Sequence, residues 1–515
     1  MSGIMINWDD SAYYVFIHGG YLDKSATKEE AYQKTVDVIQ QYANTGVTDF
    51  VMCVNGRVSS YPSKTIEHYG DLYHSKKQNG IDIDFTNTWI SSYHRLFEVY
   101  GLDFFQIWLD ELKKIGVKRW LSVRMNDAHE TLSDTSILAP HFFYENPQFR
   151  RVLHRKPRVT FDSIFDYSHA EIRKRYLDYI DETLERYDSD GLELDWLREI
   201  FCFKPGEEYK GLEIMTNFMR DVKKLVEKYE KIRGHKIDIS VRMPASIEVA
   251  FNLGFDVINW AKEGLINLVV VSPRWSTTDT DLPIELWKRF LEPYNVLVAG
   301  GIEVILRQNR SNVMTLNSRP TIAANATNIY SAGADRFYMF NYMYVPNFFY
   351  TPDVNDDFRR LYSEYNEILN ECGSLETTAK ATRRHFITFR DLLPDWNKTE
   401  YFVPAELKYD NGATTFFRIR TGKVLSDSKA YLVLGMESDD NSRINDDQIV
   451  IYVNSVEQRG LKHSKEEDHY IKNDIYVMDI RDSSILNDTN VIEIGTRGRR
   501  IVVKHLEIRI DKKDD

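Results

Sequence analysis

The sequence has few cysteines, no long apolar run and no excess of positive charge, and each shortage excludes a class of protein. Its three cysteines, Cys53, Cys202 and Cys372, stand far apart, so they predict neither a disulfide framework nor a thiolate metal site. No stretch approaches the roughly 20 apolar residues of a membrane helix, which argues against a membrane partner. Acidic residues outnumber basic ones, 78 to 66, and the net charge of −12 argues against nucleic acid as a partner.

The first residues also lack the features of a secretory signal. Residues 1–10 contain neither a basic region nor an apolar run. As written, the chain is expected in the cytoplasm. A signal removed ahead of residue 1 would instead mean a periplasmic or secreted protein.

Strand and helix patterns alternate over residues 1–372. Short apolar runs, each followed by a helical pattern, predict eight strands, at residues 12–18, 48–54, 118–125, 191–195, 237–244, 266–272, 295–299 and 336–342. Such runs are typical of parallel strands buried on both faces. The sequence therefore predicts an α/β fold, a (β/α)8 TIM barrel over residues 1–372, with long loops at 56–100 and 128–165 that shape a pocket.

An open, doubly wound sheet of eight strands is the alternative fold. Charged residues close most of the predicted strands, which suits a ring of polar groups around the mouth of a barrel. The glycine fingerprint of nucleotide-binding folds is also missing, because the first predicted strand ends in His18-Gly-Gly-Tyr-Leu-Asp23. These features favour the barrel, and no cofactor is expected.

After residue 372 the pattern changes to short alternating strands separated by Asp, Asn and Gly turns. The strands are predicted at residues 384–390, 412–420, 429–436, 448–453, 474–480, 490–495 and 500–510. This pattern predicts a jelly-roll-like antiparallel β-sandwich over residues 373–515. We expect an accessory domain that packs against the barrel and buttresses it, with sugar binding as the alternative role.

The fourth predicted strand carries two carboxylates on one face. Between Tyr187 and Arg198, Leu192 and Leu194 alternate with Glu193 and Asp195. Such a face cannot enter an ordinary apolar core, because burial of unpaired charge is costly. The polar mouth of a barrel, where chemistry lies at the C-terminal strand ends, accommodates it.

Paired carboxyl groups perform glycoside hydrolysis. One protonates the leaving oxygen, and the other attacks the sugar or activates water. Glu193 and Asp195 on strand four and Glu303 at the end of strand seven are the candidate catalytic residues. The alternative for each is a structural role: pairing with a strand arginine, anchoring a loop or starting a helix, respectively.

Polar and aromatic residues at the strand ends are candidates for substrate binding, since they suit hydrogen bonds to sugar hydroxyls or stacking on sugar faces. They are Arg124, Asn126, Asp127, Trp196, Arg242, Arg274, Trp275, Asn341, Tyr342 and His18. The arginines also suit an anionic sugar, with neutralisation of Glu193 and Asp195 as the alternative.

No metal site is predicted from the histidines. His18, His129 and His169 include no two at ligand spacing on one face. A hard cation held by Asp127 together with the two strand-four carboxylates is the alternative.

Two segments resemble the family-10-like glycosyl hydrolases. Phe165-Asp-Tyr-Ser-His169-Ala-Glu171-Ile-Arg173 is similar to their His-Pro-Glu-Val-Arg-type helix start. Arg186-Tyr-Asp-Ser-Asp190-Gly-Leu-Glu-Leu-Asp195-Trp196 is similar to their Arg-Tyr-Asp-Val-Asp-Gly segment and acidic strand end. The resemblance covers about residues 1–370 and implies a (β/α)8 fold acting on carbohydrate.

A second similarity separates the chain from the chitinases. The segment from Asp190 to Leu197 is similar to the family 18 motif Asp-Gly-x-Asp-x-Asp-x-Glu. Leu197 stands where the chitinase acid would be, and Glu193 replaces an aspartate. Substrate-assisted chitinase chemistry is therefore not expected.

The resemblance also implies roles for the carboxylates. In the retaining barrel glycosidases of the clan that includes family 10, the acid/base ends strand four and the nucleophile ends strand seven. By position this implies Asp195 or Glu193 as acid/base and Glu303 as nucleophile, although the Asn-Glu pair of that clan is absent here.

The sequence therefore predicts a retaining glycoside hydrolase that acts on an oligo- or polysaccharide. The alternatives are a carbohydrate-binding barrel without activity and a metal-dependent barrel hydrolase. A homo-oligomer is compatible with the sequence.

Overall fold

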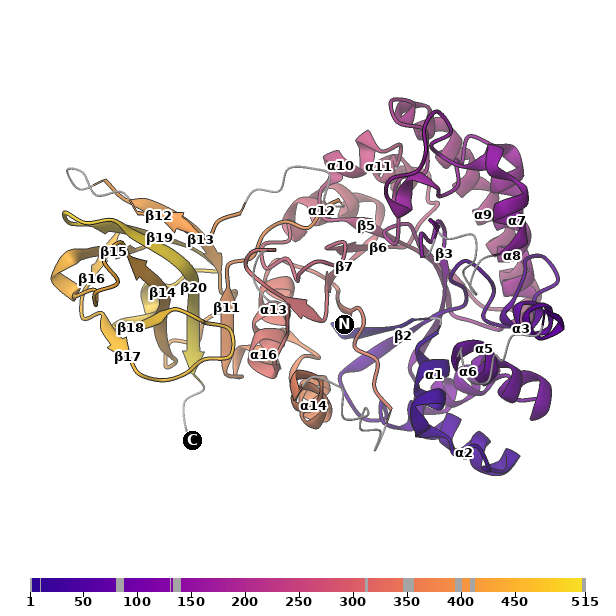
Figure 1. Ribbon diagram of the computed structural model, residues 1–515, viewed down its shortest axis with the longest axis horizontal. Helices are drawn as coiled ribbons and strands as arrows, with labels where there is room; N and C mark the ends of the chain where they lie inside the picture. The colour runs from indigo at the N-terminus through magenta and orange to yellow at the C-terminus, as the bar shows by residue number, and fades with distance from the viewer. Residues whose placement is uncertain are drawn as a thin grey trace.

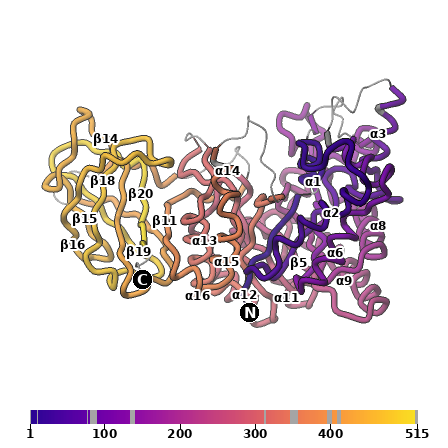
Figure 2. The backbone as a smooth tube through the Cα atoms, turned by 90° about the horizontal axis from the view of Figure 1, so that it is seen from below, coloured from indigo at the N-terminus to yellow at the C-terminus, as the bar shows by residue number. Residues whose placement is uncertain are grey.

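The computed structural model describes residues 2–9, 11–79, 88–129, 131–132, 140–310, 314–345, 356–393, 401–407 and 413–511. Over these ranges the chain forms a closed parallel barrel surrounded by helices, followed by two antiparallel sheets that lie beside it (Figure 1). The view turned by 90° shows the same arrangement, with the sheets at one end of an elongated molecule (Figure 2).

Eight strands close the barrel in the order β1-β10-β7-β6-β5-β4-β3-β2, and every neighbouring pair is parallel. They are β1 (Ile4–Trp8), β2 (Val47–Cys53), β3 (Lys118–Arg124), β4 (Gly191–Asp195), β5 (Asp238–Pro244), β6 (Leu268–Ser272), β7 (Leu297–Ile302) and β10 (Arg336–Met339). The predicted (β/α)8 barrel is confirmed.

The helices of the barrel region are α1 (Ala12–Phe16), α2 (Lys28–Gln40), α3 (Tyr69–Gln78), α5 (Thr88–Tyr93), α6 (Phe104–Ile115), α7 (His141–Glu145), α8 (Ala170–Arg186), α9 (Gly211–Arg233), α10 (Ile247–Asn252), α11 (Val257–Lys262), α12 (Ile284–Leu291), α13 (Arg319–Ser331), α14 (Asp356–Ser363), α15 (Tyr365–Glu371) and α16 (Leu375–Ala379). Two π-helical segments, η1 (Ile17–Tyr21) and η2 (His94–Val99), continue α1 and α5. Thr27 starts α2 with a capping box, in which its hydroxyl accepts from the Glu30 amide and Glu30 accepts from the Thr27 amide.

The prediction for the first strand is wrong. Residues 12–18 form α1 and the start of η1, and the strand is the preceding segment Ile4–Trp8. Tyr13, Ile17 and Tyr21 are spaced by four and bury one helical face, which a short apolar run does not distinguish from a strand. Parts of the segments predicted as loops are helical, since 56–100 contains α3, α5 and η2, and 128–165 contains α7. Residues 80–87, 130 and 133–139 of these segments lie outside the described residues.

The barrel has two apolar layers. The larger one lies between strands and helices, and a smaller one fills the interior with side chains such as Val51, Trp120, Val270 and Phe340. Trp120 lies against Gly191, where an added Cβ would meet the indole at 2.2 Å. Close contact between β3 and β4 at this point therefore depends on glycine.

The C-terminal sheets share one apolar core. One sheet has the order β11-β20-β14-β18-β17 with β12 paired to β20, and the other has the order β13-β19-β15-β16. The strands are β11 (Arg383–Phe386), β12 (Ala405–Glu406), β13 (Thr415–Arg420), β14 (Lys429–Ser438), β15 (Ile449–Val453), β16 (Val456–Gln458), β17 (Lys462–Ser464), β18 (Asp474–Ile480), β19 (Thr489–Thr496) and β20 (Ile501–Asp511). The predicted antiparallel β-sandwich is confirmed.

The sandwich and the barrel are joined by polar contacts. Arg420 of β13 forms ion pairs with Asp281 and Glu285 of the barrel, both at 2.5 Å. The Tyr470 hydroxyl donates to the Leu316 carbonyl of the short hairpin β8 (Ile305–Leu306) and β9 (Thr315–Leu316), at 2.8 Å. The sandwich therefore packs against the barrel, as expected.

Among the described residues, no helix has both the length and the apolar character that crossing a membrane requires.

The Gly191 contact gives a first prediction. Gly191→Ala should destabilise the protein by about 1–3 kcal/mol, because the new methyl group overlaps the Trp120 ring. Urea unfolding followed by tryptophan fluorescence measures the change. The exposed substitution Lys224→Ala on α9 is the control, and equal stability of the two variants would contradict the proposed crowding.

Candidate active site

The sequence just before β4 fixes the strand in place. Asp190 accepts three hydrogen bonds from Arg119, at 2.7, 2.8 and 2.9 Å. Arg186, at the end of α8, pairs with Asp103 at 2.7 Å. These polar contacts and the Gly191 contact give structural roles to Arg186, Asp190 and Gly191 of the Arg-Tyr-Asp-x-Asp-Gly segment. The segment therefore positions the strand that carries the carboxylates.

Glu193 lies inside the barrel, on the level of Ser122 and Ser240 in the neighbouring strands. Its Oε1 accepts from the Ser122 hydroxyl at 2.8 Å and from the Tyr338 hydroxyl at 3.0 Å. Complete burial, together with the nearby Asp195, raises the pKa of Glu193 to about 7. The carboxyl group is therefore poised between its two protonation states near neutral pH.

Asp195, two residues on, stands beside Arg124 and Arg242 in the register of the sheet. Arg242 binds it through two parallel hydrogen bonds, Nε to Oδ1 at 2.9 Å and Nη2 to Oδ2 at 3.0 Å. The Leu197 amide also donates to Oδ1 at 3.0 Å. Both charges are buried, and the Arg242 guanidinium lies 4.1 Å from the centre of the Phe340 ring. Asp195 is thus fixed in a bidentate pair with a buried guanidinium.

Glu303 follows β7 and is buried. Its Oε2 accepts from the Asn341 amide at 3.1 Å. Burial raises the pKa of Glu303 to about 8, against the opposing charges of Arg198 and Arg242. This carboxyl group is therefore protonated at neutral pH.

The backbone of Glu303 is held from behind. Its carbonyl accepts from the Thr278 hydroxyl at 2.6 Å, the Asn317 amide at 2.9 Å and the Tyr342 hydroxyl at 3.0 Å. Asn341, the residue before the buried Tyr342, adopts a positive φ of 64°, which asparagine tolerates better than most residues. These bonds fix the carboxyl group at the strand end.

Two charged residues that the sequence did not single out complete the centre. The positive charge of Arg198 lowers the pKa of both Glu303 and Asp127, and its guanidinium lies 5.5 Å from the Phe340 ring centre. Glu199 is buried and pairs with Arg274 at 2.7 Å. Both follow directly after the Asp-Gly-Leu-Glu-Leu-Asp-Trp-Leu segment, so proximity to that motif was the available signal.

A second polar cluster lies at the ends of β1 and β3. Arg124 pairs with Asp9 at 2.7 Å and with Asp127 at 3.2 Å. His129 Nδ1 lies 2.7 Å from Asp127, and the positive charges around this carboxylate hold its pKa well below its usual range against the effect of burial. Asp9 was missed because the first strand was placed one segment too late.

This cluster borders a pocket of about 100 Å³. Its wall includes Asp9, Arg124, Asp127 and His129, with the ring of Trp89 from α5 and that of Tyr69 from α3. The pocket lies at the C-terminal ends of β1, β2 and β3, which is the mouth of the barrel.

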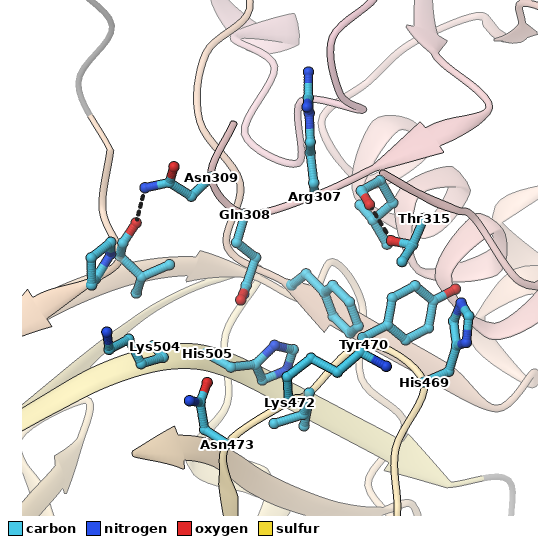
Figure 3. Close-up of a pocket in the computed structure, with 15 residues that line it drawn as sticks. Arg307, Gln308, Asn309, Thr315, His469, Tyr470, Lys472, Asn473, Lys504 and His505 are labelled. Carbon is cyan, nitrogen blue, oxygen red and sulfur yellow. Dashed lines mark hydrogen bonds between the residues drawn. The ribbon is translucent and has the colours of Figure 1, made fainter. Parts of the chain in front are cut away.

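A larger cavity, of about 340 Å³, lies between the hairpin β8-β9 and the sandwich (Figure 3). Tyr470, Lys472 and His505 line it from the sandwich side, whereas Arg307 extends away from it and donates to the Ser276 carbonyl. None of its described lining residues has a carboxyl group, so this cavity lacks the carboxyl pair that glycoside hydrolysis uses.

Trp275 is the candidate aromatic residue that stays accessible, with 41% of its surface exposed. Its amide donates to Asp391 at 2.7 Å, and Asp391 also pairs with Arg310 at 3.0 Å. Asp391 belongs to the segment after β11, which returns from the sandwich to the loop after β6. The sandwich side of the chain thus helps to shape the barrel mouth.

Four predicted binding residues do not face the mouth as expected. Trp196 is fully buried among Tyr167, Phe218 and Phe255, and Asn126 exchanges hydrogen bonds with the backbone of Phe165 at 2.9 and 3.0 Å. Tyr342 and His18 are the other two. A strand-end position alone does not reveal whether a side chain turns inward or toward the helices.

Tyr342 is buried, and its hydroxyl donates to the backbone carbonyl of Glu303. Its ring therefore cannot stack on a sugar. His18 is exposed on η1, because the strand that was expected to end there is a helix. Both are corrections to the predicted binding set.

Three arginines of the mouth pair with carboxylates. Arg242 pairs with Asp195, Arg124 with Asp127, and Arg274 with Glu199. Neutralisation of buried acids therefore explains them better than an anionic sugar does.

The three carboxylates considered as a cation site are also committed elsewhere. Asp127 contacts Arg124 and His129, Glu193 contacts two hydroxyls, and Asp195 contacts Arg242. Within the described part of the chain, a different set brings three ligand atoms within 4.8 Å, namely His74, His94 and Glu98.

Comparisons with known proteins give weak likenesses. No protein-family model and no curated protein matches the chain. The PgaB (BpsB) glycoside hydrolase domain from Bordetella bronchiseptica matches with 10% identity and a TM-score of 0.39, over 72% of this chain and 98% of that one. An α-amylase from Geobacillus thermoleovorans matches with 12% identity and a TM-score of 0.37, over 96% and 98%. An α-L-fucosidase of family GH29 from Bacteroides thetaiotaomicron matches with 9% identity and a TM-score of 0.37, over 96% and 93%. Likeness at this level establishes no shared activity.

The state of Glu303 predicts a pH dependence of stability. Its folded pKa lies above its ordinary value, so the stability it contributes is present at pH 4.5 and is lost as the pH rises toward 8. Glu303→Gln removes this loss, and its stability relative to the wild type should rise by up to about 1.4 kcal/mol per pH unit in that window. Urea unfolding at pH 5, 6, 7 and 8 measures it. The exposed substitution Glu376→Gln is the control, and parallel pH profiles of wild type and Glu303→Gln would contradict the protonated state.

Proposed function

We propose that this protein is a glycoside hydrolase that cleaves a glycosidic bond of an oligo- or polysaccharide at the mouth of its barrel. The observation that carries the proposal is the contrast between two buried carboxyl groups. Glu303 has a pKa raised to about 8, whereas Asp195 accepts two parallel hydrogen bonds from the Arg242 guanidinium. Glycoside hydrolysis needs one carboxylic acid and one carboxylate.

The contrast favours Glu303 as the proton donor and Asp195 as the carboxylate that attacks the sugar or activates water. A protonated group that Asn341 orients suits donation to the leaving oxygen. This reverses the roles that the resemblance to the family-10-like enzymes implies. Glu193, deeper in the barrel, acts on Asp195 through its charge and is a positioning residue.

The surroundings support a sugar as the substrate. The half-exposed Trp275 offers a ring for stacking, and Trp89 and Tyr69 line the small pocket beside Arg124. The pairing of Arg124, Arg242 and Arg274 with carboxylates favours a neutral sugar over an anionic one.

Two substitutions test the activity and the roles together. Glu303→Gln should lose at least 100-fold in kcat on natural glycans, because general acid catalysis contributes roughly 10²–10⁴-fold. It should keep most of its kcat/KM on 2,4-dinitrophenyl glycosides, because their leaving group needs no proton in the first step. Asp195→Asn should lose activity on both kinds of substrate. A panel of dinitrophenyl glycosides and reducing-sugar release from polysaccharides measure these rates.

The control is Glu376→Gln on α16. It removes an exposed carboxylate that pairs with Lys380, and it should keep full activity. If Asp195→Asn keeps the dinitrophenyl activity while Glu303→Gln loses it, the two roles are exchanged. If all variants match the wild type, neither residue is catalytic.

The stereochemical course is a separate prediction. The resemblance implies retention, so the sugar first released should have the anomeric configuration of the substrate. Proton NMR of the anomeric signal in the first minutes of reaction measures it, and an inverted first product would contradict a covalent intermediate on the attacking carboxylate.

A further inference from the structure

Two histidines and one glutamate meet on the helix pair α3 and η2, away from the carboxyl groups of the barrel mouth. Glu98 Oε2 lies 2.8 Å from His74 Nε2 and 2.7 Å from His94 Nδ1. All three ligand atoms lie within 4.8 Å of one another. His94 and Glu98 are four residues apart on η2, and His74 comes from α3, so two separate elements converge on one carboxylate oxygen.

The neighbours hold this arrangement in place. The ring of Tyr73 stacks on His94, with ring centres 4.0 Å apart and planes inclined by 11°. The second oxygen of Glu98 lies directly over Gly70, where a Cβ would be only 2.6 Å away. A glycine at this position leaves room for the carboxylate, and the stacked ring restricts the imidazole.

We propose that His74, His94 and Glu98 bind one divalent transition-metal ion of the zinc class. Two imidazoles and one carboxylate form a ligand set that Zn²⁺ prefers, with the remaining position left to water. Ligand atoms around tetrahedral zinc stand about 3.3 Å apart, so roughly half an ångström of separation from the present contacts admits the ion. His74 and His94 are partly exposed, with 57% and 27% of their side chains accessible, which gives the ion a route from solvent.

The ion would act as a clip on one wall of the barrel mouth. Tyr69 lies on α3 and Trp89 on α5, which continues into η2, and both side chains line the small pocket beside Arg124. Tyr93, at the end of α5, packs against Tyr69 with ring centres 6.1 Å apart. Joining α3 to η2 through a metal would therefore restrain the two elements that carry the pocket wall.

Metal binding is tested on the full chain after dialysis against a chelator. Titration with Co²⁺ should give visible absorption bands of a low-symmetry nitrogen–oxygen site, and calorimetry with Zn²⁺ should give one equivalent bound. His74→Ala, His94→Ala and Glu98→Gln should each weaken Zn²⁺ binding at least about tenfold, since even residues that only orient ligands contribute that much. Gly70→Ala, which displaces the carboxylate without removing a ligand, should weaken binding as well.

The matched control is His463→Ala. His463 also faces a carboxylate, Asp474 at 3.4 Å, but it belongs to no such triad among the described residues. Absence of binding to the wild type, or binding that the three ligand substitutions leave unchanged, would overturn the site. Circular dichroism confirms that each variant is folded.

The clip is tested separately, by hydrogen exchange. Zn²⁺ should slow the exchange of backbone amides over residues 69–78 and 94–99 in the wild type and not in Glu98→Gln. Binding without this protection would overturn the restraint while leaving the metal site in place. Neither experiment depends on glycosidase activity.

Discussion

The buried ion pair between Asp195 and Arg242 is the constraint around which the barrel mouth is built. Neither side chain has appreciable contact with solvent, and removing either partner would leave an unpaired charge in the interior. The pair also bears on the pKa values of the neighbouring acids. With the arginine committed to Asp195, burial dominates at Glu193 and Glu303 and raises the pKa of both. Three buried carboxyl groups near the barrel mouth therefore have different surroundings, and one of them is held by the fixed charge pair.

Much of the fold could be predicted from the sequence, because parallel strands buried on both faces leave a strong signal. Seven of the barrel strands and the β-sandwich were recognised from apolar runs and turn residues. The first strand was missed because the apolar residues of α1 and η1 outnumber those of Ile4–Trp8, and a short run carries no period that separates helix from strand. Because of that single error, Asp9 was left out of the candidate site and His18 was included in it.

The site was predictable only in part, for a related reason. Glu193, Asp195 and Glu303 end or follow strands, and a parallel barrel necessarily brings such residues to one edge. Whether a strand-end side chain turns into the mouth depends on one residue of register, which is why Trp196 packs toward α9 while Asp195 points inward. Contacts between distant segments, such as Asp391 with Trp275 or His74 with Glu98, leave no local pattern at all.

The path of the chain after β11 has a consequence for what counts as a unit of this protein. By its strands, the barrel is complete at β10, and β11 already belongs to the sandwich. By its hydrogen bonds the barrel is not complete at β10, because Asp391 lies after β11. Asp391 accepts a hydrogen bond from the Trp275 amide and pairs with Arg310. A shortened chain that ends before β11 would keep every barrel strand and yet release the exposed tryptophan loop. The barrel and the sandwich are therefore separate folds that together form one surface. An insertion or fusion in this region has to leave the segment around Asp391 in place.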